Sequence, residues 1–265
     1  MSTLKSTVYI NNSSFIAASP LEQFEVTDFF YISGPLLGAK FSLTNIGLYL
    51  IIVTFLVLGM SYLSLNNSKV IPSRWSLLQE SLFGSILNII NSTIGVRGQV
   101  YLPFLYTIFL YVLLSNLIGL VPYSITPSSH FVFGIGFSVT ILIGVTILGF
   151  QTHALKFFGL FVPAGTPLGL VPVLVMIETI SYAARALSLW LRLTANMIGG
   201  HVLLKIFSTF TWKAVIGGPL LLVISVIPFA FIIAFTGLEI AIAFIQSYVF
   251  TMLTASYLND AINLH

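Results

Sequence analysis

Long apolar tracts separated by short polar segments set the pattern of this chain. A bilayer core about 30 Å thick needs about 20 consecutive apolar residues in a helix. Five tracts meet or exceed that length, and they predict membrane-embedded helices at residues 43–65, 101–120, 130–150, 173–210 and 220–259. The predicted fold class is therefore an all-α polytopic membrane protein.

Residues 73–94 follow a different pattern. Apolar residues such as Trp75 and Ile89 alternate with polar residues such as Glu80 and Asn88 in a helical rhythm. This pattern is typical of an amphipathic helix that lies in the membrane interface or against a partner. The alternative, a sixth span, is weaker because polar residues recur on every turn.

The last two tracts are too long for simple crossings. Each is about 40 residues and would reach about 55–60 Å as a helix, against a core of about 30 Å. They must tilt steeply, bend or run partly outside the core. Gly217-Gly218-Pro219 is a natural turn between them, so we expect a long antiparallel hairpin, with a bend at Pro228.

Composition excludes several classes of protein. The 265 residues are 57% hydrophobic and only 6% charged, whereas soluble domains are about 45–50% apolar and about 25% charged. Cysteine is absent, which leaves no disulfide and no thiolate metal site. The net charge of +3 comes from few residues and indicates no nucleic-acid partner. No phosphate-binding loop of the G-x-x-x-x-G-K-[ST] type occurs, so we expect no catalytic centre and no nucleotide site in this chain.

Four polar residues share one narrow face of the first long tract. At about 100° per residue, Glu178, Arg185, Arg192 and Asn196 lie within about 40° of one another. A charge at membrane depth costs about 2.5–3.5 kcal/mol on insertion scales, and such groups are functional candidates by default. His201 points about 140° away from this face.

The second long tract carries Glu239, Gln246 and Asp260. Residues at the same level of an antiparallel hairpin have position numbers with a constant sum. One register, centred on the Gly-Gly-Pro turn, places His201 beside Glu239, Arg192 level with Gln246, and Glu178 beside Asp260.

This register suggests proton transfer. Histidine and carboxylates exchange protons near neutral pH, whereas arginine stays protonated in proteins. An arginine between two proton-exchanging clusters is both a barrier and a fixed positive charge. The path is then split in two and needs a carrier that the chain lacks.

Other interpretations stay open from the residues alone. His201 could be a hydrogen-bonded core residue, Arg185 could extend to the membrane surface, and Asp260 could be a solvated charge near the C-terminus. We assign no role to His130, His153 or His265. At the level of function, the alternatives are a secondary transporter, for which we find no inverted repeat between the halves, and a structural subunit of a respiratory membrane complex.

Several long motifs resemble the subunit a family of F-type ATP synthases. They are NLIGLVPYSITPSSH (116–130), FVPAGTPLGLVPVLVMIETISYAARALSL (161–189), SLWLRLTANMIGGH (188–201) and GLEIAIAFIQSYVFTMLTASYLNDAINLH (237–265). The resemblance covers nearly the whole chain after Ser19, and His201 with Glu239 matches the mitochondrial form.

The resemblance implies a membrane stator that clasps a rotating ring of c subunits. Protons would enter through one half-channel, neutralise a ring carboxylate, travel with the ring and leave through a second half-channel. Arg192 would face that ring carboxylate. His201, Glu239 and Asn196 would belong to the half-channel of the intermembrane space, and Glu178 and Asp260 to that of the matrix. Gln246, Arg185 and Asn116 match further family positions.

The resemblance also supplies location and partners. It implies a multi-pass protein of the mitochondrial inner membrane that contacts the c-ring, the peripheral stalk, other membrane subunits and lipid, within a dimeric synthase; its transported ion is H⁺ and it has no cofactor. The SPLEQFEV stretch at 19–26 resembles the mature start of some fungal members, in which a short leader is removed. We therefore expect residues 1–18 to be such a leader, followed by one membrane domain at 19–265. The basic residues divide equally between the two sides of five crossings, so the orientation also rests on the resemblance.

Overall fold

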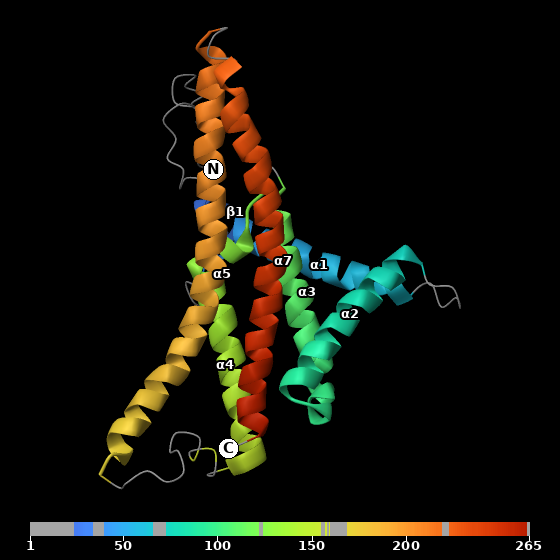
Figure 1. The fold of residues 1–265 in the computed structure, drawn as a ribbon, viewed down its shortest axis with the longest axis vertical. Coiled ribbons are helices and arrows are strands. Elements are labelled where there is room, and N and C mark those ends of the chain that lie inside the picture. The colour runs from blue at the N-terminus through green and yellow to red at the C-terminus, as the bar shows by residue number, and fades with distance from the viewer. Residues whose placement is uncertain are drawn as a thin grey trace.

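The computed structural model describes residues 24–33, 40–65, 73–121, 124–154, 157, 159, 169–218 and 223–263, and it is built almost entirely of helices (Figure 1). Within these residues, five helices are long and apolar enough to cross a membrane. They are α1 (Asn45–Leu65), α3 (Leu102–Gly119), α4 (Phe131–His153), α5 (Val171–Ile216) and α7 (Val226–Ile262). The predicted fold class is confirmed.

The amphipathic segment forms a separate helix, α2 (Arg74–Thr93). Ser73 caps its N-terminus, because the Ser73 hydroxyl accepts a hydrogen bond from the amide of Ser76 at 3.3 Å. One face buries Ile86 and Ile90 completely, while Leu77, about 180° from Ile86 around the helix, is exposed. The helix therefore covers the bundle along one face, as its alternating pattern predicts.

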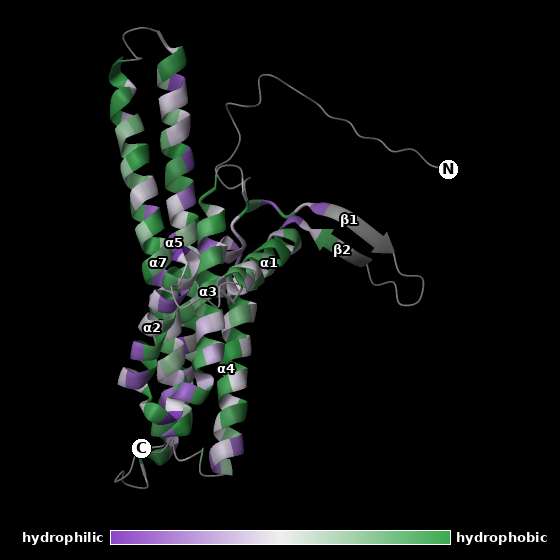
Figure 2. Cartoon of the chain, turned by 90° about the vertical axis from the view of Figure 1, so that its right-hand side faces the viewer, coloured by the Kyte–Doolittle hydropathy of each residue, from purple (hydrophilic) through white to green (hydrophobic). Residues whose placement is uncertain are grey.

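A small antiparallel hairpin precedes the helices. Strand β1 (Asp28–Ser33) pairs with β2 (Lys40–Thr44), and it extends away from the bundle (Figure 2). Asn45, at the start of α1, holds the preceding chain, because its side-chain amide donates to the carbonyl of Glu25 at 3.0 Å and its backbone amide donates to that of Thr27 at 3.0 Å. The proposed leader at 1–18 lies outside the described residues.

The core lies where α3 meets α2, α4 and α7. Leu105, Leu110 and Ile90 are almost completely buried there, together with Phe250 of α7. Phe250 stacks on Phe137 of α4 with ring centroids 5.6 Å apart. Outside this core the helices present apolar residues to their surroundings (Figure 2), as expected where lipid replaces water.

The two long helices form the expected hairpin. They lie side by side, their linked ends extend beyond the rest of the bundle, and α5 diverges from α7 toward its N-terminal end, which is yellow in Figure 1. α5 has 46 residues, about 69 Å of helix, and α7 has 37, about 56 Å. Both exceed a bilayer core of about 30 Å, so the hairpin must tilt or project from the membrane.

Glycine and proline residues explain where α5 ends and where α7 begins. Gly217 and Gly218 follow α5, and Gly218 adopts φ +120°, a conformation open to glycine. Residues 223 and 224 are helical, the regular helix of α7 begins only at Val226, and Pro228 lies in its first turn. Proline lacks the amide that would bond to the carbonyl four residues earlier, which accounts for the interruption at Ser225.

The four glycines of α4 divide into two pairs by what surrounds them. A Cβ atom on Gly134 would lie 2.7 Å from Thr194 Oγ1 of α5, and one on Gly149 would overlap the ring of Phe157. Gly136 and Gly144 have no described neighbour within 4 Å of such an atom. Within the described chain, glycine therefore permits a close approach at the first pair and at neither position of the second.

Candidate functional site

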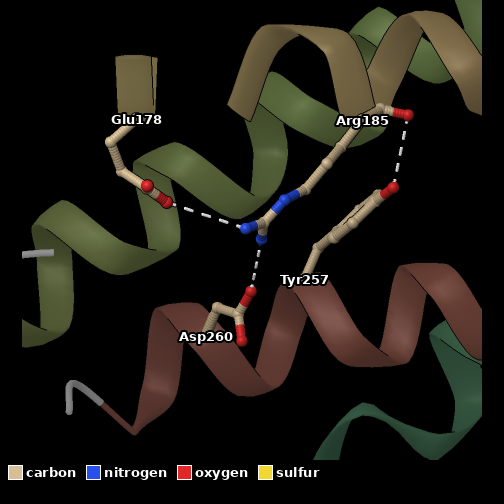
Figure 3. Close-up of polar contacts among 4 residues, drawn as sticks. All are labelled: Glu178, Arg185, Tyr257 and Asp260. Carbon is tan, nitrogen blue, oxygen red and sulfur yellow. Dashed lines mark hydrogen bonds and ion pairs between the residues drawn. The ribbon is translucent and has the colours of Figure 1, made fainter. Parts of the chain in front are cut away.

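A cluster of polar side chains joins α5 to the C-terminal end of α7 (Figure 3). The guanidinium of Arg185 lies between two carboxylates. Its Nη1 donates to Asp260 Oδ2 at 2.9 Å, and its Nη2 is 3.7 Å from Glu178 Oε1. The hydroxyl of Tyr257, one turn before Asp260, donates to the backbone carbonyl of Arg185 at 3.3 Å.

Helical periodicity explains how this cluster forms. Glu178 and Arg185 are seven residues apart and share a face of α5, and Asp260 faces them from α7. The sequence predicted Glu178 beside Asp260; the structure places Arg185 between them. One cation and two carboxylates carry a net charge of −1, so the cluster can take up one proton and become neutral.

The middle of the hairpin is held by two amides. Asn196 Nδ2 of α5 donates to Gln246 Oε1 of α7 at 3.2 Å, and Gln246 is 4% exposed. The sequence register placed Gln246 level with Arg192; its hydrogen bond goes to Asn196, one turn further along α5. The amide pair fixes the two helices together beside Arg192.

Arg192 differs from Arg185 although periodicity puts both on one face. It is exposed, and among the described residues its guanidinium forms no ion pair and no hydrogen bond. A cation at membrane depth needs a counter-charge or water. A partner for Arg192 would have to come from outside the described chain.

A second polar group lies nearer the hairpin turn. His201 Nε2 and Thr126 Oγ1 are 2.9 Å apart, and Thr126 is 3% exposed in the turn before α4. Glu239 of α7 packs against Gly200, the neighbour of His201, so closely that a Cβ atom on Gly200 would overlap its Oε1. This agrees with the predicted register, although no hydrogen bond joins His201 to Glu239.

Glu239 and Asn116 are buried polar side chains without visible partners. Glu239 is 6% exposed and Asn116, on α3, is 0% exposed. Both side-chain polar atoms of each lack a hydrogen-bond partner among the described residues. Such groups are costly unless they are paired or hydrated, so they mark the polar interior of the helix bundle.

Three residues in these contacts escaped the sequence analysis. Thr126 and Tyr257 were not singled out, and His153 was assigned no role. His153 Nε2 lies 2.8 Å from the carbonyl of Ile262, at the end of α7. Each contact joins segments more than 70 residues apart, and no local pattern indicates them. No group of three or more His, Asp or Glu residues in the described chain could hold a metal ion.

The described residues contain five helices long and apolar enough to span a membrane, with ionisable side chains between the two longest. These features define the class: an integral membrane protein with polar groups suited to ion or proton transfer. The particular family follows from comparison with known proteins. The model of the family described as "ATP synthase A chain" matches residues 47–259. The chain belongs to this family, the proton-channel stator subunits of F-type ATP synthases.

Curated relatives are similar in sequence to this chain along nearly its whole length. ATP synthase subunit a of Neurospora crassa is 50% identical over 261 residues, 98% of this chain and 100% of that protein. The subunit a of Emericella nidulans is 51% identical over 249 residues, 93% of this chain and 97% of its own. The subunit a of Chondrus crispus is 46% identical over 251 residues, 95% of this chain and 98% of that protein.

Family membership settles the general role. The chain is a non-catalytic, multi-pass subunit of the mitochondrial inner membrane, and it works with the other subunits of the ATP synthase. The expected identity, location and lack of a catalytic role are confirmed at this level.

Proposed function

We propose that this chain forms two offset half-channels that pass protons to and from the carboxylates of a c-ring, with Arg192 between them. The observation that carries the proposal is the exposed guanidinium of Arg192, which has no ion-pair partner in the described chain. A ring carboxylate that passes this face of α5 would supply the missing charge. Because Arg192 stays protonated, it would also prevent protons from moving directly between the half-channels.

His201 and Glu239, with Asn196 and Asn116, form the half-channel of the intermembrane space in this proposal. Buried polar atoms without a partner in the described part of the chain, such as those of Glu239 and Asn116, are suited to hold water, and a chain of water and polar groups can pass protons. Protons from this side would reach a ring carboxylate and neutralise it, which allows that carboxylate to turn toward lipid.

Glu178, Arg185 and Asp260 form the matrix half-channel. Asp260 holds the short contact with Arg185 at 2.9 Å and Glu178 the longer one at 3.7 Å. Asp260 therefore keeps Arg185 in place, and Glu178 is the more loosely held carboxylate of the cluster. Arg192 favours the ionised form of the ring carboxylate by its positive charge, and so promotes release of the proton toward this cluster.

Gln246 has a supporting role. Its hydrogen bond to Asn196 fixes α7 to α5 one turn from Arg192, so the guanidinium has a defined position relative to the ring. The c-ring is the partner that this mechanism requires. Contacts with the peripheral stalk and within a synthase dimer are further expectations that follow from family membership.

The test is Arg192→Ala in the assembled complex. We expect proton-driven ATP synthesis to fall by about 100-fold or more, the scale on which loss of one fixed electrostatic contact acts in a water-poor site. The amount of assembled complex should not change, because the guanidinium of Arg192 forms no ion pair and no hydrogen bond within the described chain. Leu191→Ala, at the neighbouring exposed position, is the matched control. Synthesis at the wild-type rate in the Arg192 variant would show that the proposal is wrong.

A further inference from the structure

The C-terminal end of α7 is fastened from two directions. From α5, Arg185 binds Asp260 through its guanidinium and Tyr257 through its backbone carbonyl. From α4, the imidazole of His153 reaches the carbonyl of Ile262, with Nε2 2.8 Å from that oxygen. His153 lies in the last turn of α4, and it is the one ionisable side chain of that helix.

The contact with Ile262 gives a carbonyl at the end of α7 a hydrogen bond that the helix itself cannot provide. The last carbonyls of a helix have no partner within the helix, and histidine near this end can bond to them and interact favourably with the helix dipole. A carbonyl oxygen only accepts hydrogen bonds, so Nε2 of His153 carries the hydrogen. The bond therefore forms whether or not the imidazole is charged.

This hydrogen bond lies next to the proposed matrix half-channel. Ile262 follows Asp260 by two residues, within the same turn of α7. Helix ends fray when their last turn lacks outside contacts, and fraying here would move Asp260 away from Arg185. His153 also connects this turn to α4, a helix that contributes no side chain to the cluster drawn in Figure 3.

We propose that His153 is a positioning residue for proton release: its Nε2–H holds the last turn of α7 so that Asp260 stays against Arg185. The inference rests on the proposed function of the Glu178–Arg185–Asp260 cluster. It assigns to α4 a direct part in the geometry of that cluster, through one hydrogen bond to the backbone.

Two amide substitutions test the bond itself. In His153→Gln the amide nitrogen is as many bonds from Cβ as Nε2 is in histidine, so it can still donate to the Ile262 carbonyl. In His153→Asn the amide nitrogen sits at the Nδ1 position and falls short. A net hydrogen bond is worth about 0.5–1.5 kcal/mol, which corresponds to a factor of about 2 to 12. We expect ATP synthesis per assembled complex to fall by such a factor in the asparagine variant and to be largely retained in the glutamine variant.

A second measurement reports on the helix end directly. The chain contains no cysteine, so Asn263→Cys gives it a single site for a spin label, at an exposed position just after α7. We expect a more mobile label with His153→Asn than with the native histidine, and little change with His153→Gln.

The outcomes are distinct. The inference is overturned if the asparagine variant matches the native protein in rate and label mobility, or if the glutamine variant loses as much. It is also overturned if the asparagine variant fails to assemble while the glutamine variant assembles, since the bond would then be structural only. Arg192→Ala in the same preparation separates the two proposals: its loss of synthesis with no effect of His153→Asn refutes only the role of His153, whereas full synthesis with Arg192→Ala refutes the proposed half-channels.

Discussion

Arg185 and Arg192 lie seven residues apart on the same face of α5, yet their environments differ. Arg185 is held between Glu178 and Asp260, which offsets the cost of placing its charge near the membrane interior. Arg192 is exposed without such a pair in the described chain. The first arrangement stabilises a fixed cluster, and the second leaves a charge available to a partner that moves.

Glycine at position 200 is explained by the carboxylate next to it. Glu239 occupies the space that a side chain at 200 would fill. Because the obstructing atom is the end of a flexible side chain, Gly200→Ala should displace the carboxylate of Glu239 and leave the helices in place.

We expect Gly200→Ala to lower proton-driven ATP synthesis by about tenfold, equivalent to about 1.4 kcal/mol, with normal assembly. Glu239→Asp shortens the side chain by one methylene and relieves the overlap, so the double variant should lose less than the two single effects combined. The measurement is a double-mutant cycle on the rate of synthesis. Strictly additive effects would contradict the proposed contact.

The packing of α4 against α5 depends on which face of α4 a glycine occupies. Gly134 lies against Thr194 and Trp190 of α5, whereas Gly136, two residues later, points to open space. Successive positions two apart are on opposite sides of a helix. The pair is therefore a matched comparison within one element.

We expect Gly134→Val to reduce the amount of assembled complex, because overpacking of a close helix contact costs about 1–3 kcal/mol. Gly136→Val should leave assembly unchanged. The complex can be quantified on native gels from equal amounts of membrane. Equal tolerance of both substitutions would mean that α4 and α5 do not approach as closely as the structure shows.

At the scale of the whole molecule, two clusters of polar side chains lie at different levels of the hairpin formed by α5 and α7. Thr126, His201 and Glu239 lie toward the linked ends of α5 and α7, and the Arg185 cluster lies toward the C-terminus. A proton that crosses a potential of 100 mV gains about 2.3 kcal/mol, so one proton provides only a fraction of what ATP synthesis requires. A rotating carrier that collects several protons fits this arrangement.

A path split in two should conduct no protons when the ring cannot carry them. We expect membrane vesicles that contain the complex, with the ring carboxylates blocked by a carbodiimide, to show almost no proton uptake through it at an imposed potential of about 100 mV. The comparison is the same vesicles before the block. Equal proton conductance before and after would indicate a continuous path through this chain and contradict the two half-channels.

The amino-acid sequence by itself determined the fold class and the general arrangement of the hairpin formed by α5 and α7. The length of each apolar tract, compared with the thickness of the bilayer core, predicts the five spans. The spans must be helical because a backbone in lipid satisfies its hydrogen bonds within each helix. Helical periodicity placed Glu178, Arg185 and Arg192 on one face, and the Gly-Gly-Pro segment indicated the turn of the hairpin. The near pairing of His201 with Glu239 also followed from the antiparallel register.

Tertiary structure alone decided which of these groups meet. Periodicity cannot distinguish Arg185 from Arg192, since both occupy the same face; their difference arises because α7 brings Asp260 to the first and nothing comparable to the second. The partners of His201 and His153 lie 75 and 109 residues away along the chain. Sequence spacing reports position around one helix, whereas these contacts depend on how separate helices pack, and only the folded chain contains that information.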